Sequence, residues 1–208
     1  MSGFFVTLEG GEGAGKSTQV KRLAARLAEK NISVVTTREP GGSPGAEEIR
    51  ALLVNGAPGR WDALTETLLV YAARADHVKH TIGPALLAGK WVISDRFTDS
   101  TFAYQGAGRG LARETIRRID SVVLDDFKPD MTLMLDLDVE TGLKRAQSRG
   151  GAESRFESFD REFHEKLRQA FLDIARRSPD RCQVIDAAQD PDAVAAAIWS
   201  AVARRFDL

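Results

Sequence analysis

A glycine-rich segment near the N-terminus constrains the fold of this chain more than any other feature. Residues 10–18 read GGEGAGKST and match the pattern G-x-x-x-x-G-K-[ST] without a gap. The segment follows a short apolar run, residues 4–8, and opens an amphipathic stretch, residues 16–30. In such a loop, successive backbone N–H groups and the positive end of the helix dipole form a cradle for phosphate. The sequence therefore predicts a strand, a phosphate-binding loop and a helix, in that order.

The side chains of this loop indicate a nucleoside triphosphate as the ligand. Lys16 carries a full positive charge that can follow a transferring phosphoryl group, and Ser17 offers a hydroxyl to Mg²⁺ between the β- and γ-phosphates. The alternative is a glycine-rich turn of no chemical consequence, which the combination of pattern and context disfavours. The loop residues that we expect to bind ATP are Gly10, Gly11, Glu12, Gly13, Ala14, Gly15, Lys16, Ser17 and Thr18.

The rest of the chain alternates short apolar runs with longer amphipathic stretches. Each run is apolar nearly throughout, which is typical of strands covered on both faces in a parallel sheet. We therefore predict one α/β domain over residues 1–208, a three-layer sandwich like that of P-loop NTPases, with a five-stranded parallel sheet flanked by helices. The predicted strands are residues 4–8, 32–36, 91–94, 131–137 and 182–185, and the predicted helices are 16–30, 46–54, 64–88, 113–124, 139–147, 159–177 and 192–206.

Composition narrows the possible partners and the compartment. The 29 basic and 30 acidic residues nearly cancel, which argues against wholesale attraction to nucleic acid or to an acidic membrane. Cys182 is the only cysteine, so no intrachain disulfide can form, and we expect a buried thiol there. No signal peptide or membrane-spanning run is evident. We expect a cytoplasmic protein that binds neither nucleic acid nor membrane.

Three arginines stand where a phosphoryl acceptor would bind. Arg38 and Arg96 each follow a predicted strand, and Arg74 lies inside the helical stretch 64–88. The planar guanidinium group suits phosphates and base edges, so we expect the three to converge, a surface ion pair being the alternative for any one of them. GTP-dependent switches need a base-reading motif, N-K-x-D, that this sequence lacks, and motors are usually larger. A small kinase is the remaining class.

These segments resemble the thymidylate kinase family, of the bacterial type. The resemblance implies the reaction ATP + dTMP → ADP + dTDP with Mg²⁺, a step of dTTP synthesis, catalysed by a homodimer that packs through helix 64–88. A kinase of another (deoxy)nucleoside monophosphate and a non-catalytic ATP-binding module are the alternatives. The segments that carry the resemblance are residues 9–17, 37–42, 71–74, 95–106, 129–136 and 185–187.

The resemblance also implies residue roles on the acceptor side. Arg74 would read the thymine edge, and Arg38 and Arg96 would hold the dTMP phosphate. Glu12 would accept a hydrogen bond from the 3′-hydroxyl, while Tyr104 would exclude a 2′-hydroxyl. Asp95 would lie near Mg²⁺ with Ser17; Asp136 or Asp138 is the alternative carboxylate. The implied dTMP-binding residues are Glu12, Arg38, Pro40, preceded by a cis peptide bond, Val70, Arg74, Arg96, Ser100, Thr101, Tyr104 and Gln105.

Val70 departs from the family pattern. Members usually carry an aromatic residue four positions before the base-reading arginine, on the same helix face, where it stacks on thymine. Valine offers van der Waals contact without a ring. Phe97, Phe102 or Tyr71 compensates, or thymine binds less tightly, or the preferred base differs.

A polar, glycine-containing segment at about 147–157 is predicted to be a mobile lid. The phosphate loop offers no arginine at positions 11–14, so a catalytic arginine must come from elsewhere. Bacterial members of the family carry it in the lid, and Arg149 and Arg155 are the candidates beside the catalytic Lys16 and Arg96. Arg145 would stack on adenine. His77 and His80 are expected on the helix surface rather than at a metal.

Overall fold

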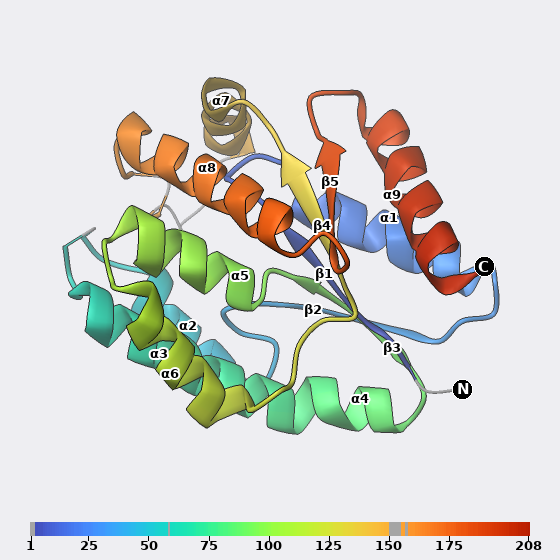
Figure 1. Cartoon of the computed structure of the whole chain (residues 1–208), viewed down its shortest axis with the longest axis horizontal. Helices are drawn as coiled ribbons and strands as arrows, with labels where there is room; N and C mark the ends of the chain where they lie inside the picture. The colour runs from blue at the N-terminus through green and yellow to red at the C-terminus, as the bar shows by residue number, and fades with distance from the viewer. Residues whose placement is uncertain (1–2, 58, 150–154, 157) are drawn as a thin grey trace.

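The computed structural model describes residues 3–57, 59–149, 155–156 and 158–208, and its centre is a parallel β-sheet (Figure 1). The sheet has five strands in the order β2-β3-β1-β4-β5, and every neighbouring pair is parallel. Because β1, β3 and β4 are almost entirely buried, most of their residues are apolar. The strands are β1 (Phe5–Glu9), β2 (Val34–Arg38), β3 (Trp91–Asp95), β4 (Met131–Asp136) and β5 (Cys182–Asp186).

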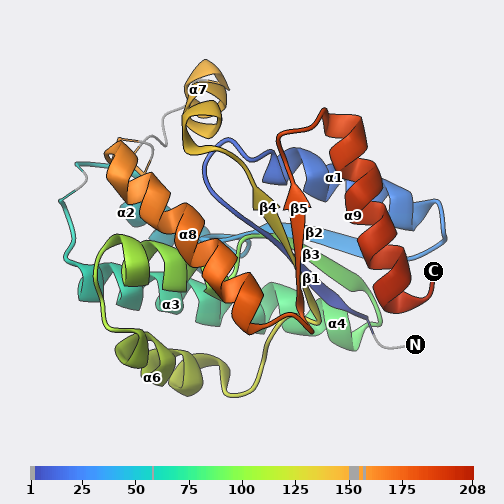
Figure 2. The ribbon, with the colours of Figure 1, turned by 45° about the horizontal axis from the view of Figure 1, so that its top comes forward.

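Helices α1 (Lys16–Ala28) and α9 (Pro191–Phe206) cover one face of this sheet, side by side in both views (Figures 1 and 2). Their buried side chains, including Leu23 and Ile198, pack on Val6 and Leu133 of the central strands. This largely apolar packing fixes α1, and with it the loop that precedes α1, against the sheet.

The remaining helices form the third layer, on the opposite face. Phe5 and Val92 project from the sheet into this side, where they pack with Tyr71, Phe97 and Ile116. The predicted fold class, a five-stranded parallel sheet between two helical layers, is confirmed. The helices of this layer and its rim are α2 (Pro44–Val54), α3 (Ala63–His77), α4 (Gly83–Leu87), α5 (Thr98–Thr101), α6 (Arg113–Leu124), α7 (Val139–Arg149) and α8 (Arg161–Arg177).

Two segments of this layer differ from the prediction. The stretch 64–88 is helical throughout but widens to a π-helix at η1 (Val78–Ile82), just before Pro84, which has no N–H to donate to the preceding turn. The second segment, after β3, is helical from Thr98 and continues as the π-helix η2 (Phe102–Gly108), in a region for which we predicted no helix. Its polar and glycine-rich sequence carries no helical periodicity that could have revealed it.

Two smaller expectations, the burial of Cys182 and the cis peptide bond before Pro40, are confirmed. The Cys182 thiol is buried, and burial raises its pKa to about 11. The peptide bond between Glu39 and Pro40 is cis. Within the described ranges, no helix has both the length and the apolar content required to cross a bilayer.

Candidate nucleotide site

The phosphate loop connects β1 to α1 at the carboxyl edge of the sheet. Gly13 and Gly15 have φ values of +69° and +85°, which side chains with a Cβ rarely adopt. A Cβ on Gly13 would also stand 1.9 Å from the carbonyl oxygen of Gly142 in α7. Lys16 folds back over the loop and donates from Nζ to the carbonyl oxygens of Gly10 (3.1 Å) and Gly11 (2.8 Å). The loop therefore curls around its own lysine and presents its amides to an anion.

The lysine is buried, and its surroundings change its proton affinity. Burial and the nearby Arg96 guanidinium lower the pKa of Lys16 to about 8, although Asp95 and Glu12 oppose the shift. Glu12 shows the reverse balance: burial would raise its pKa, but Arg96 and Lys16 bring it down to about 2. Both groups therefore carry their charges at neutral pH, one positive and one negative, on the same loop.

Ser17, in the first turn of α1, and Asp95, at the end of β3, are brought together by the fold. The Ser17 hydroxyl donates to Oδ2 of Asp95 at 2.5 Å, because β1 and β3 are neighbours and end at the same edge. A hydroxyl and a carboxylate are oxygen donors of the kind that Mg²⁺ prefers, so these residues fit the metal. Asp136, the alternative, is instead held by Arg168 through contacts of 2.7 and 3.0 Å.

Arg96 organises the centre of the site. It follows β3 with φ +73°, and the resulting turn directs its guanidinium towards the phosphate loop. There it donates to the Gly10 carbonyl (2.9 Å), to Oε1 of Glu12 (3.0 Å) and to the Tyr104 hydroxyl (2.9 Å). The Tyr104 hydroxyl in turn donates to Oε1 of Glu12 at 2.5 Å. Three residues from three parts of the sequence thus form one hydrogen-bonded unit.

Arg74 is only 1% exposed and lines a pocket that Arg96 also borders. Its Nε donates to Oε2 of Glu39 at 2.7 Å, and one terminal nitrogen donates to the Thr101 hydroxyl at 3.1 Å. The guanidinium also stacks on the rings of Tyr71 (4.7 Å) and Phe97 (5.1 Å). The side chain is thereby fixed in one position before any ligand binds.

His77 is not on the helix surface as predicted. It is fully buried, with Nδ1 3.0 Å from Oε1 of Glu39 and Nε2 2.6 Å from the Thr37 hydroxyl. His77 therefore contacts one oxygen of the Glu39 carboxylate, whose other oxygen accepts the hydrogen bond from Arg74. Its helical neighbour His80 is exposed, as predicted. The spacing of the two histidines could not distinguish these environments, because the fold and not the helix decides which side is covered.

Two cavities meet at this edge of the sheet. The smaller, of about 70 Å³, is bordered by Val70, Arg74 and Phe97, together with the predicted Ser100, Thr101, Tyr104 and Gln105. The larger, of about 300 Å³, is bordered by Lys16, Ser17, Asp95 and the predicted Arg38. Glu12, Glu39, Pro40, Arg96 and Phe156 border both cavities. One elongated molecule can therefore occupy both.

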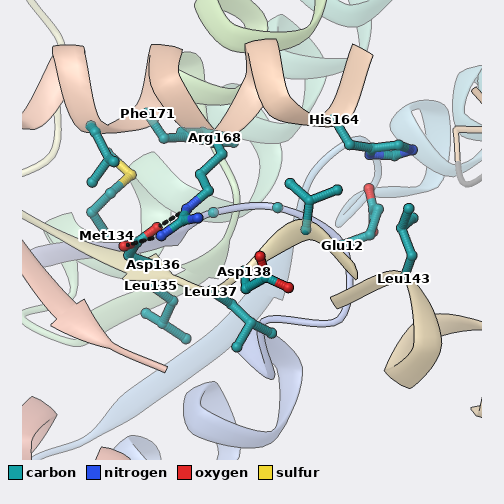
Figure 3. A pocket seen from close by; sticks show the side chains of 14 residues that line it. Glu12, Met134, Leu135, Asp136, Leu137, Asp138, Leu143, His164, Arg168 and Phe171 are labelled. Atoms are coloured by element: carbon teal, nitrogen blue, oxygen red, sulfur yellow. Dashed lines mark hydrogen bonds and ion pairs between the residues drawn. The ribbon is translucent and has the colours of Figure 1, made fainter. Parts of the chain in front are cut away.

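A third cavity lies between the loop, the end of β4 and α8 (Figure 3). Glu12, His164 and the paired Asp136 and Arg168 border it. Its volume of about 20 Å³ suits a single water molecule and is far too small for a nucleotide. The two cavities that meet beside the phosphate loop are therefore the candidate substrate sites.

The remaining predicted residues stand as follows. Arg38 is half exposed and pairs with Glu47 at 3.1 Å. Arg145 donates to the carbonyl oxygen of Ala187 at 3.1 Å. The side chain of Arg149 and residues 150–154 and 157 of the predicted lid lie outside the described residues. Arg155, one of the two candidate catalytic arginines of the predicted lid, is buried in an ion pair with Glu66.

Sequence reasoning missed Arg50 and Phe156. Arg50, in α2, borders the larger cavity and donates to the Pro40 carbonyl at 2.5 Å. It shares a helix face with the buried Ala46, Leu53 and Val54. A cation within an otherwise apolar stripe was the signal that would have found it. Phe156 carried no such signal, since it stands alone in a polar segment.

A parallel sheet whose first strand leads through a phosphate-cradling loop into a helix defines a nucleotide-binding protein of the P-loop class. A family model described as thymidylate kinase matches residues 8–198. The chain is 57% identical to the thymidylate kinase of Caulobacter vibrioides over 99% of both chains, and 49% identical to that of Magnetococcus marinus over 99% of this chain and 98% of the relative. The crystal structure of thymidylate kinase from Ehrlichia chaffeensis is similar with a TM-score of 0.78 at 35% identity, covering 97% of this chain and 99% of that one. The chain belongs to the thymidylate kinase family.

Proposed function

We propose that this protein transfers the γ-phosphoryl group of ATP to dTMP, giving ADP and dTDP. The observation that carries the proposal is the junction of the two cavities. The larger cavity is lined by the phosphate loop, the smaller one ends on Arg74, and Arg96 borders both. Family membership supports the same reaction. Two nucleotides bound there would meet phosphate to phosphate.

On the donor side, the amides of residues 10–18 would bind the ATP phosphates, and Lys16 would follow the transferring group. Ser17 and Asp95 would hold Mg²⁺, which when bound neutralises charge on the β- and γ-phosphates. Arg145, beside Ala187, would cover the adenine ring. Release of Lys16 from the carbonyl oxygens of Gly10 and Gly11 frees its ammonium group for phosphate.

On the acceptor side, Arg38, Arg50 and Arg96 would bind the dTMP phosphate in the larger cavity. The base would enter the smaller cavity against Arg74, Gln105 and Val70, with Ser100 and Thr101 at its wall. Glu12 and Tyr104, which border the base pocket, would face the sugar. Pro40 would close the pocket from the side of β2.

Catalysis in this arrangement consists of alignment and charge stabilisation. An oxygen of the dTMP phosphate is already ionised near neutral pH, so it attacks the γ-phosphorus directly, without a protein nucleophile or a general base. Charge that develops between the two nucleotides needs cations, and Lys16 and Arg96 are placed to supply two of them. We propose Arg149 as the arginine that completes the set, acting from the predicted lid.

We further propose that residues 1–208 act as a single nucleoside monophosphate kinase domain in the cytoplasm, as a homodimer. Leu64 and Leu68 lie one turn apart on α3 and are 44% and 51% exposed. A partner copy covering that helix would remove both apolar side chains from water.

An acceptor panel tests the function. Coupled ADP release is measured with dTMP, dUMP, dCMP, dGMP and dAMP, on the wild type and on Val70→Phe. We expect dTMP to give the highest kcat/KM, and Val70→Phe to lower the KM for dTMP by supplying a stacking ring. Preference for another monophosphate would identify a different kinase of this class. ATP binding without ADP production from any acceptor would favour a binding module.

A further inference from the structure

We propose that Arg155 is a positioning residue for the acceptor nucleotide, acting through Glu66 and Phe156, and not a catalytic arginine. The inference rests on the proposed function, because it concerns how the acceptor pocket of that reaction keeps its shape. Its basis is a buried polar cluster that lies behind the pocket.

Arg155 is bound on every side of its guanidinium group. Nε donates to the carbonyl oxygen of Ala57 (3.1 Å), one terminal nitrogen to that of Leu53 (2.9 Å) and the other to Oε2 of Glu66 (2.5 Å). The side chains of Arg155 and Glu66 are both 0% exposed. To reach a transferring phosphoryl group, Arg155 would have to break three charge-assisted hydrogen bonds and leave a buried carboxylate behind.

Glu66 connects Arg155 to Gln105, a residue that lines the pocket. Its Oε1 accepts a hydrogen bond from Nε2 of Gln105 at 2.9 Å, and its Oε2 also pairs with Arg109 at 3.2 Å. Gln105 borders the smaller cavity, whereas Glu66 and Arg109 do not. Glu66 therefore fixes the rotamer of a pocket residue, and Arg155 holds Glu66 in place for that role.

Phe156, the next residue in the chain, is the second connection. It borders both cavities, as do Glu12 and Arg96, so it stands where the sugar of the acceptor would lie. The Arg155 guanidinium lies 5.0 Å from the centre of its ring, and the ring meets Tyr104 edge to face at 5.5 Å. Arg155 thus holds an aromatic wall over the acceptor and against the residue expected to exclude a 2′-hydroxyl.

The chemistry of this cluster concerns binding and not transfer. Arg155, Glu66 and Gln105 do not border the larger cavity, where Lys16, Ser17 and Asp95 lie; Phe156 borders it on the side of Glu12 and Arg96. Loss of Arg155 should therefore weaken the fit of the acceptor, while ATP binding and the transfer step continue in the complexes that form.

Steady-state kinetics with dTMP and ATP varied separately test the inference. We expect Arg155→Met to raise the KM for dTMP about tenfold or more, with the KM for ATP and kcat within about threefold of the wild type. Phe156→Leu should act in the same direction. The double variant should be no worse than Arg155→Met alone, because residues that act through one another give non-additive effects. Arg155→Lys, which keeps a charge for Glu66, should recover part of the loss.

Arg161→Met is the matched control, since Arg161 is an exposed arginine that pairs with Glu165 at 3.8 Å, and it should leave both KM values unchanged. A fall in kcat of about 10³-fold with unchanged KM for dTMP would make Arg155 catalytic and overturn the inference. Equal rises in both KM values, or additive effects in the double variant, would also overturn it. Should Arg155→Met fail to fold by circular dichroism, Phe156→Leu and Arg155→Lys carry the same test.

Direct titration separates this inference from the proposed function. Calorimetry of wild type and Arg155→Lys with dTMP reports acceptor affinity without turnover. Binding of dTMP that Arg155→Lys weakens, in a protein that transfers no phosphate, would sink the proposed function and leave the inference standing. Equal affinity of the two proteins would sink the inference alone, and absence of any monophosphate binding by the wild type would sink both.

Discussion

The Lys16 ammonium group lies inside the phosphate loop, where it donates to two backbone carbonyl oxygens. We expect Lys16→Met to lower kcat by about 10³-fold, because a fixed positive charge disappears from the path of the phosphoryl group. Arg96→Ala should act similarly. Lys21→Met, on the exposed side of the same helix, is the control. Full activity in both Lys16→Met and Arg96→Ala would show that these roles are wrongly assigned.

The burial of Glu9 leads us to predict that the free energy of unfolding depends on pH. It is fully buried at the end of β1 and accepts hydrogen bonds from the Phe97 amide (2.7 Å) and the Ser100 hydroxyl (2.6 Å). Burial, helped by the nearby Asp99 carboxylate, raises the pKa of Glu9 from 4.5 to about 8. The folded state thus holds a proton that the unfolded chain releases, so this stabilisation is complete below pH 4.5 and is lost as the pH rises through about 8.

Glu9→Gln should remove that loss, because a neutral amide has no proton to give up. Urea unfolding of both proteins at pH 6 and pH 9 should show the variant gaining on the wild type by about 2 kcal/mol over this interval. Glu29→Gln, whose carboxylate is exposed, should not gain. Parallel pH dependences of wild type and Glu9→Gln would contradict the raised pKa.

At the scale of elements, α7 is tied to the phosphate loop by a glycine contact. A Cβ on Gly142 would lie 2.5 Å from the carbonyl oxygen of Glu12, closer than side chains tolerate. We expect Gly142→Ala to push α7 away from the loop, to cost about 1–2 kcal/mol of stability and to raise the KM for ATP severalfold. Thermal unfolding and kinetics would measure both. Gly59→Ala, with nothing within 4 Å of the added carbon, serves as control, and an unaffected ATP KM would rule out the coupling.

The elements also show what the sequence could reveal. All five strands and the helices of regular amphipathic pattern were predictable to within a few residues, because burial in a parallel sheet leaves continuous apolar runs. The phosphate loop followed from its motif, and the placement of Asp95 near Ser17 followed from the family resemblance. The η2 segment, Arg50 and the burial of His77 and Arg155 did not, because each depends on which distant element packs over it. Arg155 meets Glu66 across 89 residues of sequence, a separation that no local pattern records.

For the whole molecule, the exposed leucines of α3 lead to a prediction about assembly. We expect the protein to sediment at about twice its 22.7 kDa, and Leu68→Glu to give a monomer, since a buried unpaired carboxylate is costly. Analytical ultracentrifugation measures both. Leu208→Glu changes an exposed leucine at the chain end and should leave the assembly intact. A monomeric wild type, or a Leu68→Glu variant that stays dimeric, would exclude this face.

The cations around the larger cavity have acidic or polar partners within the protein: Arg38 pairs with Glu47, and Arg96 pairs with Glu12. These carboxylates neutralise part of the positive charge of the arginines, and a phosphate that binds to the arginines would take the place of the carboxylates as their counter-ion. Added salt competes for the half-exposed Arg38 but hardly reaches the enclosed Arg155 and Glu66. Higher ionic strength should therefore weaken the binding of the nucleotide phosphates without changing the conformation of the residues that line the acceptor pocket.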